Sequence, residues 1–231
     1  IMYHQVTELV LKLMIHEIEQ VTEAPKLTNA FAIEKLGRLQ RHTDMLITSF
    51  DVMKDGMNYE DYNKFRFSLT PASGFQSAQF RELELMCTPI DHLINAEEQK
   101  NMPNDASIAE KFNHIYWQAA GYNKTTGHKT RTLKDFEEKY LADFIALTEK
   151  MKGKTLKEQL NKLPSPSAEV FKAARNFDFA YNVKWPLTHL RTATRYLEKK
   201  GEKKAATGGS DWKKYLHPKF QQRQFFPELW K

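Results

Sequence analysis

Apolar residues recur at three- and four-residue steps along most of this 231-residue sequence, and no alternating pattern of useful strand length interrupts them. Such spacing puts apolar side chains on one face of an α-helix, whereas a half-buried strand has a period of two. We therefore expect an all-α fold, a helical bundle with long antiparallel helices and shorter elements between them. The predicted helices cover residues 2–23, 28–53, 58–67, 76–86, 107–120, 132–151 and 168–199.

Residues that favour helix ends stand at several of the predicted boundaries. Thr28 or Asn29 can cap the second helix and Asn58 the third, because their side chains accept hydrogen bonds from free backbone N–H groups. Gly153 is expected to stop one helix, and Pro186, which lacks a backbone N–H, to bend or interrupt the last. The apolar residues expected on the inner faces of the first two helices are Val6, Leu9, Val10, Leu13, Ile18 and Val21, and Phe31, Leu36, Leu39, Met45, Leu46 and Phe50.

Composition narrows the class of protein. With 41% apolar and 12% aromatic residues the chain can bury a large core, and a single domain over residues 1–231 is predicted because no clear boundary appears. No apolar run of about eighteen residues indicates a membrane span, and the start carries no signal-peptide pattern. The single cysteine, Cys87, excludes an internal disulfide and a multi-cysteine zinc site, which favours the cytoplasm.

The net charge of +6 raises the question of an anionic partner such as nucleic acid. The basic residues are spread along the chain, with one local cluster in residues 199–204 around Gly201. This composition predicts a solvated loop. A nucleic-acid partner is not expected, because no aromatic and basic residues are interleaved as they are in nucleic-acid-binding modules.

Residues 65–84, FRFSLTPASGFQSAQFRELE, are an unusual mixture for a helical core. Arg66 stands at a predicted helix end, a Pro-Ala-Ser-Gly turn follows, and a glutamine-rich segment leads back into helix. A guanidinium can donate two parallel hydrogen bonds to a carboxylate, so this pattern is typical of a site for an anion. The alternative for Arg66 is a surface ion pair with Glu60 or Asp61.

This segment closely resembles the central signature of tryptophan 2,3-dioxygenases, the haem enzymes that open the indole ring of L-tryptophan. Two further blocks carry the same resemblance. They are residues 4–9, HQVTEL, near the start, and His189 followed by residues 207–210, TGGS, and 226–230, FPELW. The resemblance implies an all-helical haem-dioxygenase domain whose helices enclose a haem pocket.

The implied cofactor is haem b, an iron porphyrin. By resemblance, His189 binds the haem iron from the proximal side, and Ser73 lies against the haem edge close to a propionate. A neutral imidazole on a rigid helix is a natural axial ligand, although a lone helical histidine is more often a packing or surface residue. The other histidines are interpreted as surface or packing residues: His16, His42, His92, His114, His128 and His217.

The implied substrate site uses four residues. By resemblance, His4 is the distal catalytic residue and accepts a hydrogen bond from the indole N–H. Arg66 binds the carboxylate, Thr207 binds the ammonium group, and Tyr62, one turn before Arg66, reaches the same anion or lines the pocket. Without the resemblance, His4 is an ordinary helix histidine and Thr207 belongs to a flexible, glycine-flanked loop. Packing roles are expected for Gln76, Ser77, Gln79 and Arg81.

The implied reaction inserts both atoms of O₂ across the indole C2–C3 bond of L-tryptophan to give N-formylkynurenine, the first product of the kynurenine pathway. Family members are typically homotetramers, so a homotetramer is expected.

Two alternatives stay open. Ala206 stands where the family has glycine, and Asp211-Trp212 follow Ser210 where it has Ser-Gly, which allows a related haem-dependent aromatic amino-acid oxygenase or hydroxylase with another substrate. A haem-free helical interaction protein is the third interpretation, and it predicts no Soret band. Because the sequence begins at Ile1, and the family's aromatic residue four positions before the distal histidine falls just before it, an N-terminal segment is expected to precede it.

Overall fold

A computed structural model describes residues 2–65, 77–94, 96–103, 105–122, 126–199, 202–203, 213, 217–221 and 223–230. Its helices are α1 (Met2–Thr22), α2 (Asn29–Gly56), α3 (Tyr59–Phe65), α4 (Ala78–Cys87), α5 (Ala96–Asn101), α6 (Ile108–Phe112), α7 (Arg131–Met151), α8 (Leu156–Asn161), α9 (Ala168–Phe179), α10 (Trp185–Leu197) and α12 (Pro218–Gln221). Three short 3₁₀ helices, η2 (Ile90–Leu93), η3 (Gln118–Gly121) and η5 (Pro227–Trp230), and the π-helical η4 (Ala180–Lys184) complete the helical elements of these residues. The strands within this part are β1 (Glu198–Lys199) and β2 (Glu202–Lys203), a two-residue antiparallel ribbon, so the predicted all-α class is confirmed.

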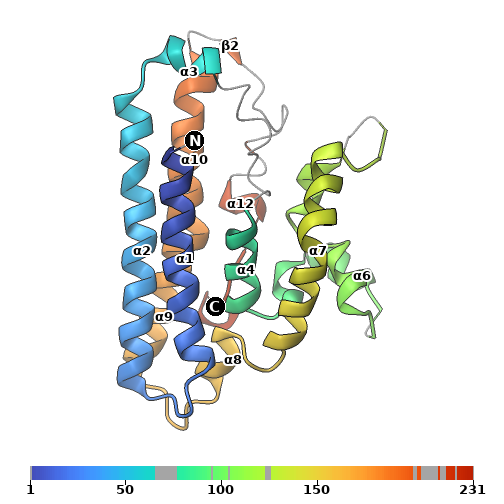
Figure 1. The fold of residues 1–231 in the computed structure, drawn as a ribbon. Helices are drawn as coiled ribbons and strands as arrows, with labels where there is room; N and C mark the ends of the chain where they lie inside the picture. The colour runs from blue at the N-terminus through green and yellow to red at the C-terminus, as the bar shows by residue number, and fades with distance from the viewer. Residues whose placement is uncertain are drawn as a thin grey trace.

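Three long helical elements form the main bundle: α1, α2 and the continuous α9–η4–α10, with α4 packed against α1 (Figure 1). α1 and α2 are antiparallel, as predicted. The continuous helix α9–η4–α10 runs parallel to α2. Asn29 at the start of α2 donates to the carbonyl of Ser165 just before α9 (2.9 Å), and Tyr196 near the end of α10 contacts Met53 near the end of α2. Among the described residues, no helix is both long enough and apolar enough to cross a membrane.

The N-terminus of α2 forms where the sequence predicts it. The Thr28 hydroxyl caps the helix by accepting a hydrogen bond from the backbone N–H of Phe31 (3.3 Å). α1 and α2 then bury Met14, Ile18 and Leu36 completely between them and their neighbours. Each such side chain contributes roughly 1.5–3 kcal/mol by leaving water, so this apolar contact dominates the stability of the pair.

A charged cluster fixes the register of α1 against α2. The carboxylate of Glu17, 2% exposed, accepts hydrogen bonds from Lys35 Nζ (2.9 Å) and from Arg38 Nε (2.7 Å). Burial opposes ionisation of Glu17, but the hydrogen bonds from the two cations outweigh it and lower its pKa. A buried carboxylate is costly unless it is paired, so any slip of the two helices that separates these groups is disfavoured.

The predicted inner faces of α1 and α2 are partly wrong. Val6, Leu9 and Leu13 are 48%, 61% and 46% exposed, and Met45 on α2 is also exposed. α1 carries apolar residues around much of its circumference, and the row containing Val10, Met14 and Ile18 is the one that packs against α2 and α4. Periodicity identifies an amphipathic helix, but it cannot choose between two apolar rows.

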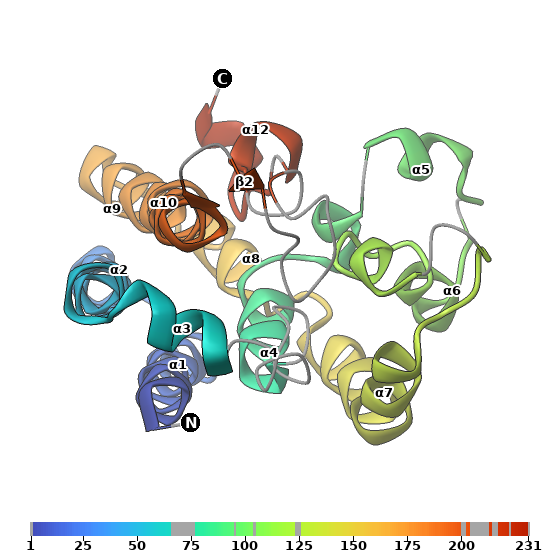
Figure 2. The ribbon, with the colours of Figure 1, turned by 90° about the horizontal axis from the view of Figure 1, so that it is seen from above.

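The middle of the chain forms a second hydrophobic core beside the bundle. α5, α6 and α7 lie on the opposite side of α4 from α1, α2 and α10 (Figure 2). This core includes Leu85 from α4, Trp117 and Phe144. The predicted single helix over residues 107–120 is wrong: α6 ends at Phe112, because the backbone of Ile115 forms an isolated bridge with Ile94.

A buried polar network joins the two cores. Tyr116 lies among Arg81, Glu84 and Arg223: its hydroxyl donates to Glu84 (2.6 Å) and accepts from Arg81 (2.5 Å) and Arg223 (2.6 Å). Burial is the main cause that raises the pKa of Tyr116 to about 12. Arg81 and Glu84 belong to α4, Tyr116 to the loop after α6, and Arg223 to the C-terminal segment of residues 223–230. The network therefore connects these three parts of the chain.

The last long helix contains a π-helical turn where the sequence predicts a bend at Pro186. Over η4 the backbone is wider than in an α-helix, and the N–H of Trp185 donates to the carbonyl of Ala180, five residues back. Proline cannot donate to the carbonyl four residues earlier and its ring collides with that carbonyl, so a regular α-turn is disfavoured here. The π-turn accommodates Pro186 within a continuous helix.

A cavity of about 480 Å³ lies between α1, α4 and α7. Glu19, Glu82 and Asp143 line it, together with Lys150 and Lys154 and apolar residues. Burial is the first cause that raises the pKa of Glu82, and the negative charges of Asp143, Glu8 and Glu19 raise it further. At neutral pH the ionised Glu82 therefore costs stability.

Replacing Glu82 by glutamine is expected to stabilise the protein, raising the melting temperature by roughly 1–3 °C at neutral pH. A carboxyl with a raised folded pKa begins to destabilise the fold above its unfolded pKa, and the cost is complete once the pH exceeds the folded pKa. The gain from E82Q should thus disappear in acid, where Glu82 is protonated. Thermal unfolding across pH measures it, and Glu138→Gln at an exposed position of α7 is the control. A gain that persists at low pH would contradict this explanation.

Candidate functional site

The residues with predicted chemical roles that the structure describes gather at one end of the bundle. His4 lies in the first turn of α1 and His189 in the second turn of α10. Between them stand two aromatic side chains in contact. The Tyr3 ring lies 6.4 Å from Phe50 of α2, and Phe50 is stacked on the imidazole of His189 with ring centres 5.4 Å apart. Three helices that are distant in sequence therefore meet at this point.

The environment of His189 keeps its imidazole neutral. The side chain is accessible to solvent, although surrounding protein desolvates it. Desolvation is the main cause that lowers its pKa to about 4, and repulsion from His4 contributes. Within the described residues, neither ring nitrogen has a hydrogen-bond partner. A neutral imidazole with an available lone pair is the form that binds a metal.

His4 has a similar electrostatic state on the facing helix. Burial is the first cause that lowers its pKa, and the carboxylate of Glu8, one turn further along α1, opposes this shift. The neighbouring Tyr3 is fixed by a hydrogen bond of 2.9 Å between its hydroxyl and that of Ser49. A neutral His4 retains one ring nitrogen that can accept a hydrogen bond from a ligand.

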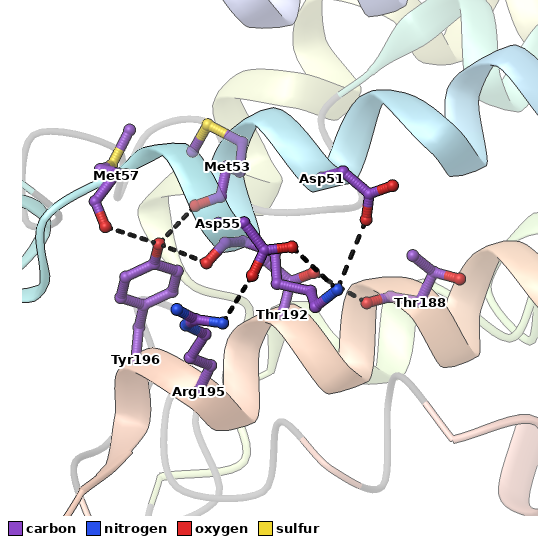
Figure 3. A network of polar contacts seen from close by, with 9 residues as sticks. Asp51, Met53, Asp55, Met57, Thr188, Thr192, Arg195 and Tyr196 are labelled. Carbon is purple, nitrogen blue, oxygen red and sulfur yellow. Dashed lines mark hydrogen bonds and ion pairs between the residues drawn. The ribbon is translucent and has the colours of Figure 1, made fainter.

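The end of α10 is anchored to the end of α2 (Figure 3). The Tyr196 hydroxyl points at the carbonyl groups of Met53 and Lys54 in the last turn of α2 and of Met57 just after it. Arg195 forms an ion pair with Asp55 (2.7 Å), which also binds Lys54 (3.0 Å). Carbonyls at a helix C-terminus lack partners within their own helix, so Tyr196 satisfies them while it fixes α10, which carries His189, against α2.

Tyr62 lies against the same part of α10. It is half-buried on α3, and its ring stacks on Tyr196 with centres 4.3 Å apart. Asn58 caps α3, as predicted, by accepting hydrogen bonds from the backbone N–H groups of Glu60 (2.8 Å) and Asp61 (3.4 Å). Arg66 is the first residue after α3, and like Ser73 and Thr207 it lies outside the described residues.

The signature segment contacts the first helix. Gln79 Nε2 on α4 donates to the carboxylate of Glu8 (2.7 Å) and to its backbone carbonyl (3.1 Å). Ser77 caps α4 by accepting a hydrogen bond from the N–H of Phe80 (3.2 Å), and Arg81 belongs to the buried network with Glu84. Two blocks of the sequence that carry the resemblance are thus joined directly in space, through packing residues as expected.

Sequence reasoning missed two residues of this site. Phe50 was predicted as a core residue of α2, yet it stacks on His189. Tyr196 was not singled out, although it stands seven residues after His189 and so lies two turns along the same helix face. The spacing of Tyr196 was a usable signal, whereas the partner of Phe50 depends on how α2 packs against α10.

The donor set fits a haem better than a metal ion held by protein ligands alone. Among the described residues, no three His, Cys, Asp or Glu side chains gather as a metal site. A haem iron needs a single protein ligand on one side, and the accessible, neutral His189 can provide it. The cavity beside Glu82 is a separate feature, because His4, Tyr62 and His189 do not line it.

Several known proteins with similar sequences carry the same description. Residues 1–161 match the family described as tryptophan 2,3-dioxygenase. The tryptophan 2,3-dioxygenase of Bacillus thuringiensis subsp. konkukian is 29% identical over all of this chain and 81% of the relative's length. The enzyme of Cupriavidus necator is 28% identical over all of this chain and 77% of the relative's length. That of Dictyostelium discoideum is 37% identical over 36% of this chain and 22% of its own length.

Proposed function

Since the chain belongs to the tryptophan 2,3-dioxygenase family, we propose that it oxidises L-tryptophan with O₂ to N-formylkynurenine, with haem b as its cofactor. It is an oxidoreductase of the dioxygenase class that acts in tryptophan catabolism. The observation that supports the haem site best is the meeting of His4 and His189, from opposite ends of the chain, through Tyr3 and Phe50.

The haem is proposed to be held by His189 as the proximal ligand of the iron, with Ser73 against its edge. The cofactor, when bound, supplies the iron at which O₂ is activated. The low pKa of His189 supports this role, because the imidazole is neutral without having to lose a proton on binding. The stack on Phe50 limits rotation of the ring, and Tyr196 holds the helix on which it stands.

The substrate is proposed to be held at both of its ends. His4 accepts a hydrogen bond from the indole N–H and so positions the ring. Arg66 donates two hydrogen bonds to the carboxylate, and the hydroxyl of Thr207 accepts one from the ammonium group. Tyr62 reaches the same carboxylate or lines the pocket from α3, whose contact with Tyr196 fixes α3 against α10. Fixing both ends lowers the entropic cost of reaching the reactive geometry.

Homotetrameric assembly is the proposed state. A row of apolar side chains on α1, Met2, Val6, Leu9 and Leu13, recurs at steps of four, three and four residues and is 46–80% exposed. Such a row is typical of a helix that packs against another helix. We further propose a single haem-dioxygenase domain over residues 1–231, in the cytoplasm.

The direct test is anaerobic reduction of the haem-loaded protein, followed by L-tryptophan and O₂, with N-formylkynurenine measured by its absorbance and mass. We expect a Soret band, which the substrate perturbs, and stoichiometric product that depends on O₂. A Soret band without this product would favour the second candidate, an oxygenase of another aromatic amino acid, which the Ala206 and Asp211-Trp212 departures support. Absence of haem binding would refute both.

A further inference from the structure

Asp178, close to the end of α9, is a buried carboxylate that binds the C-terminal segment of residues 223–230. It is fully inaccessible to solvent. Its oxygens accept hydrogen bonds from the backbone N–H groups of Phe225 (3.1 Å) and Phe226 (3.0 Å) and from Trp230 Nε1 (2.9 Å). A fourth bond comes from Asn182 Nδ2 (2.6 Å), one turn further along the helix. A carboxylate accepts about four hydrogen bonds, so Asp178 is saturated, and three of its donors belong to the C-terminal segment.

The same segment packs against the helix that leads to His189. Phe225 is fully buried, with its ring centre 5.2 Å from that of Tyr181. Tyr181 meets Trp185 edge to face at 5.1 Å. Trp185 is the first residue of α10 and precedes His189 by four residues, which places the two on one helix face one turn apart. An unbroken chain of ring contacts therefore runs from the anchored segment to the turn below His189.

The helix needs such support at this point. η4 replaces the regular α-helical hydrogen bonds just before α10, and Pro186 offers no backbone donor. The Tyr181 side chain within η4 is fully buried, and its hydroxyl has no hydrogen-bond partner among the described residues. Tyr181 is thus held by packing alone, and Phe225 supplies one of its walls.

We propose that Asp178 is a positioning residue for the haem ligand: by binding the C-terminal segment, it presses Phe225 against Tyr181 and Trp185 and so fixes the orientation of His189. This inference rests on the proposed function, because it assumes that His189 binds haem. The competing explanation is that Asp178 only stabilises the fold, like any other buried and hydrogen-bonded carboxylate.

The test compares Asp178→Asn with a matched control in the haem-loaded protein. Asparagine has almost the same shape, but its NH₂ group replaces one of the two oxygens and so faces a donor, the backbone N–H of either Phe225 or Phe226. Glu17→Gln is the control, since Glu17 is also buried and paired, but its partners Lys35 and Arg38 belong to α2, and it lies about 20 Å along α1 from His4. Three quantities are measured: the melting temperature, the rate of haem transfer to an excess of apomyoglobin, and the ferrous iron–histidine stretching band in the resonance Raman spectrum.

We expect D178N to shift or broaden the iron–histidine band and to accelerate haem loss about tenfold, whereas E17Q lowers the melting temperature and leaves the band unchanged. Trp230→Phe removes a single donor and is the milder variant if D178N does not fold; it should shift the band in the same direction. A lowered melting temperature in D178N and W230F with an unaltered band and haem-loss rate would overturn the proposal. A wild-type protein without a histidine-ligated haem spectrum would instead refute the proposed function and, with it, this role of Asp178.

Discussion

Replacing His189 by alanine is expected to abolish the spectrum of histidine-ligated haem and to prevent stable haem uptake. His189 is the ligand proposed on the proximal side, and its removal leaves the iron without a protein donor there. The Soret band of the ferrous protein measures the loss. His114→Ala is the matched control, because His114 is also exposed but pairs with Glu98, away from α1, α2 and α10.

Added imidazole provides a second test of the proposed role of His189. Alanine at position 189 leaves a space of the size of an imidazole, so added imidazole should restore a histidine-like spectrum in His189→Ala. The wild-type protein should respond much less, since its own ring occupies the position and is held by Phe50. An H189A variant that keeps the unaltered native spectrum would refute the proximal assignment.

Replacing Arg66 by alanine is expected to weaken L-tryptophan binding by about 2–4 kcal/mol, or roughly 30- to 700-fold, while haem uptake stays intact. The loss arises because a substrate carboxylate desolvated in the site would have no cationic partner. Titration of the ferrous protein with tryptophan, followed in the Soret region, gives the dissociation constant. Arg66→Lys keeps the charge but cannot form two parallel hydrogen bonds, so an intermediate affinity is expected.

The Arg66 result separates the two interpretations of that residue. If Arg66 only formed a surface ion pair with Glu60 or Asp61, alanine would leave tryptophan affinity unchanged. Asp61 already pairs with Lys64 at 3.2 Å, and both side chains are exposed, so an ion pair at this surface would contribute little. Unchanged affinity in R66A would therefore refute the carboxylate role.

Helix ends with strong local chemistry could be predicted from the sequence. Thr28 caps α2. Gly153 follows the end of α7 in a left-handed conformation with φ of +73°, which few residues other than glycine adopt. These helix ends are determined by a few neighbouring residues, so they form independently of contacts with the rest of the fold. The long helices α1, α2 and α7 were predicted to within a few residues for this reason.

Features that depend on distant contacts could not be predicted. Ile115 has helical spacing from its neighbours, yet its backbone pairs with Ile94 and breaks the expected helix. The short helix α8 was missed, although Thr155 and Glu158 form a capping box at its start. On α1, contacts with α2 and α4 determine which apolar row is buried, and these contacts cannot be read from the sequence of α1 alone.

The candidate site shows the same division. His4 and His189 were found through the resemblance of short blocks, because a helix histidine alone carries little information. Their meeting depends on the packing of α1, α2 and α10, and the stack of Phe50 on His189 follows only from that packing. The chemical roles of His4, Tyr62 and His189 remain predictions, and so do those of Arg66, Ser73 and Thr207, which lie outside the described residues.

The π-turn of η4 also determines the direction in which the side chains of α10 point. Such a turn carries one residue more than an α-turn, and one residue corresponds to about 100° of rotation around a helix. Deleting a single residue from 180–184 would make the helix a regular α-helix throughout. The deletion would also rotate His189 away from Phe50 by that angle and move Tyr196 away from the carbonyls of α2. The number of residues in this segment therefore determines the direction in which the His189 side chain points.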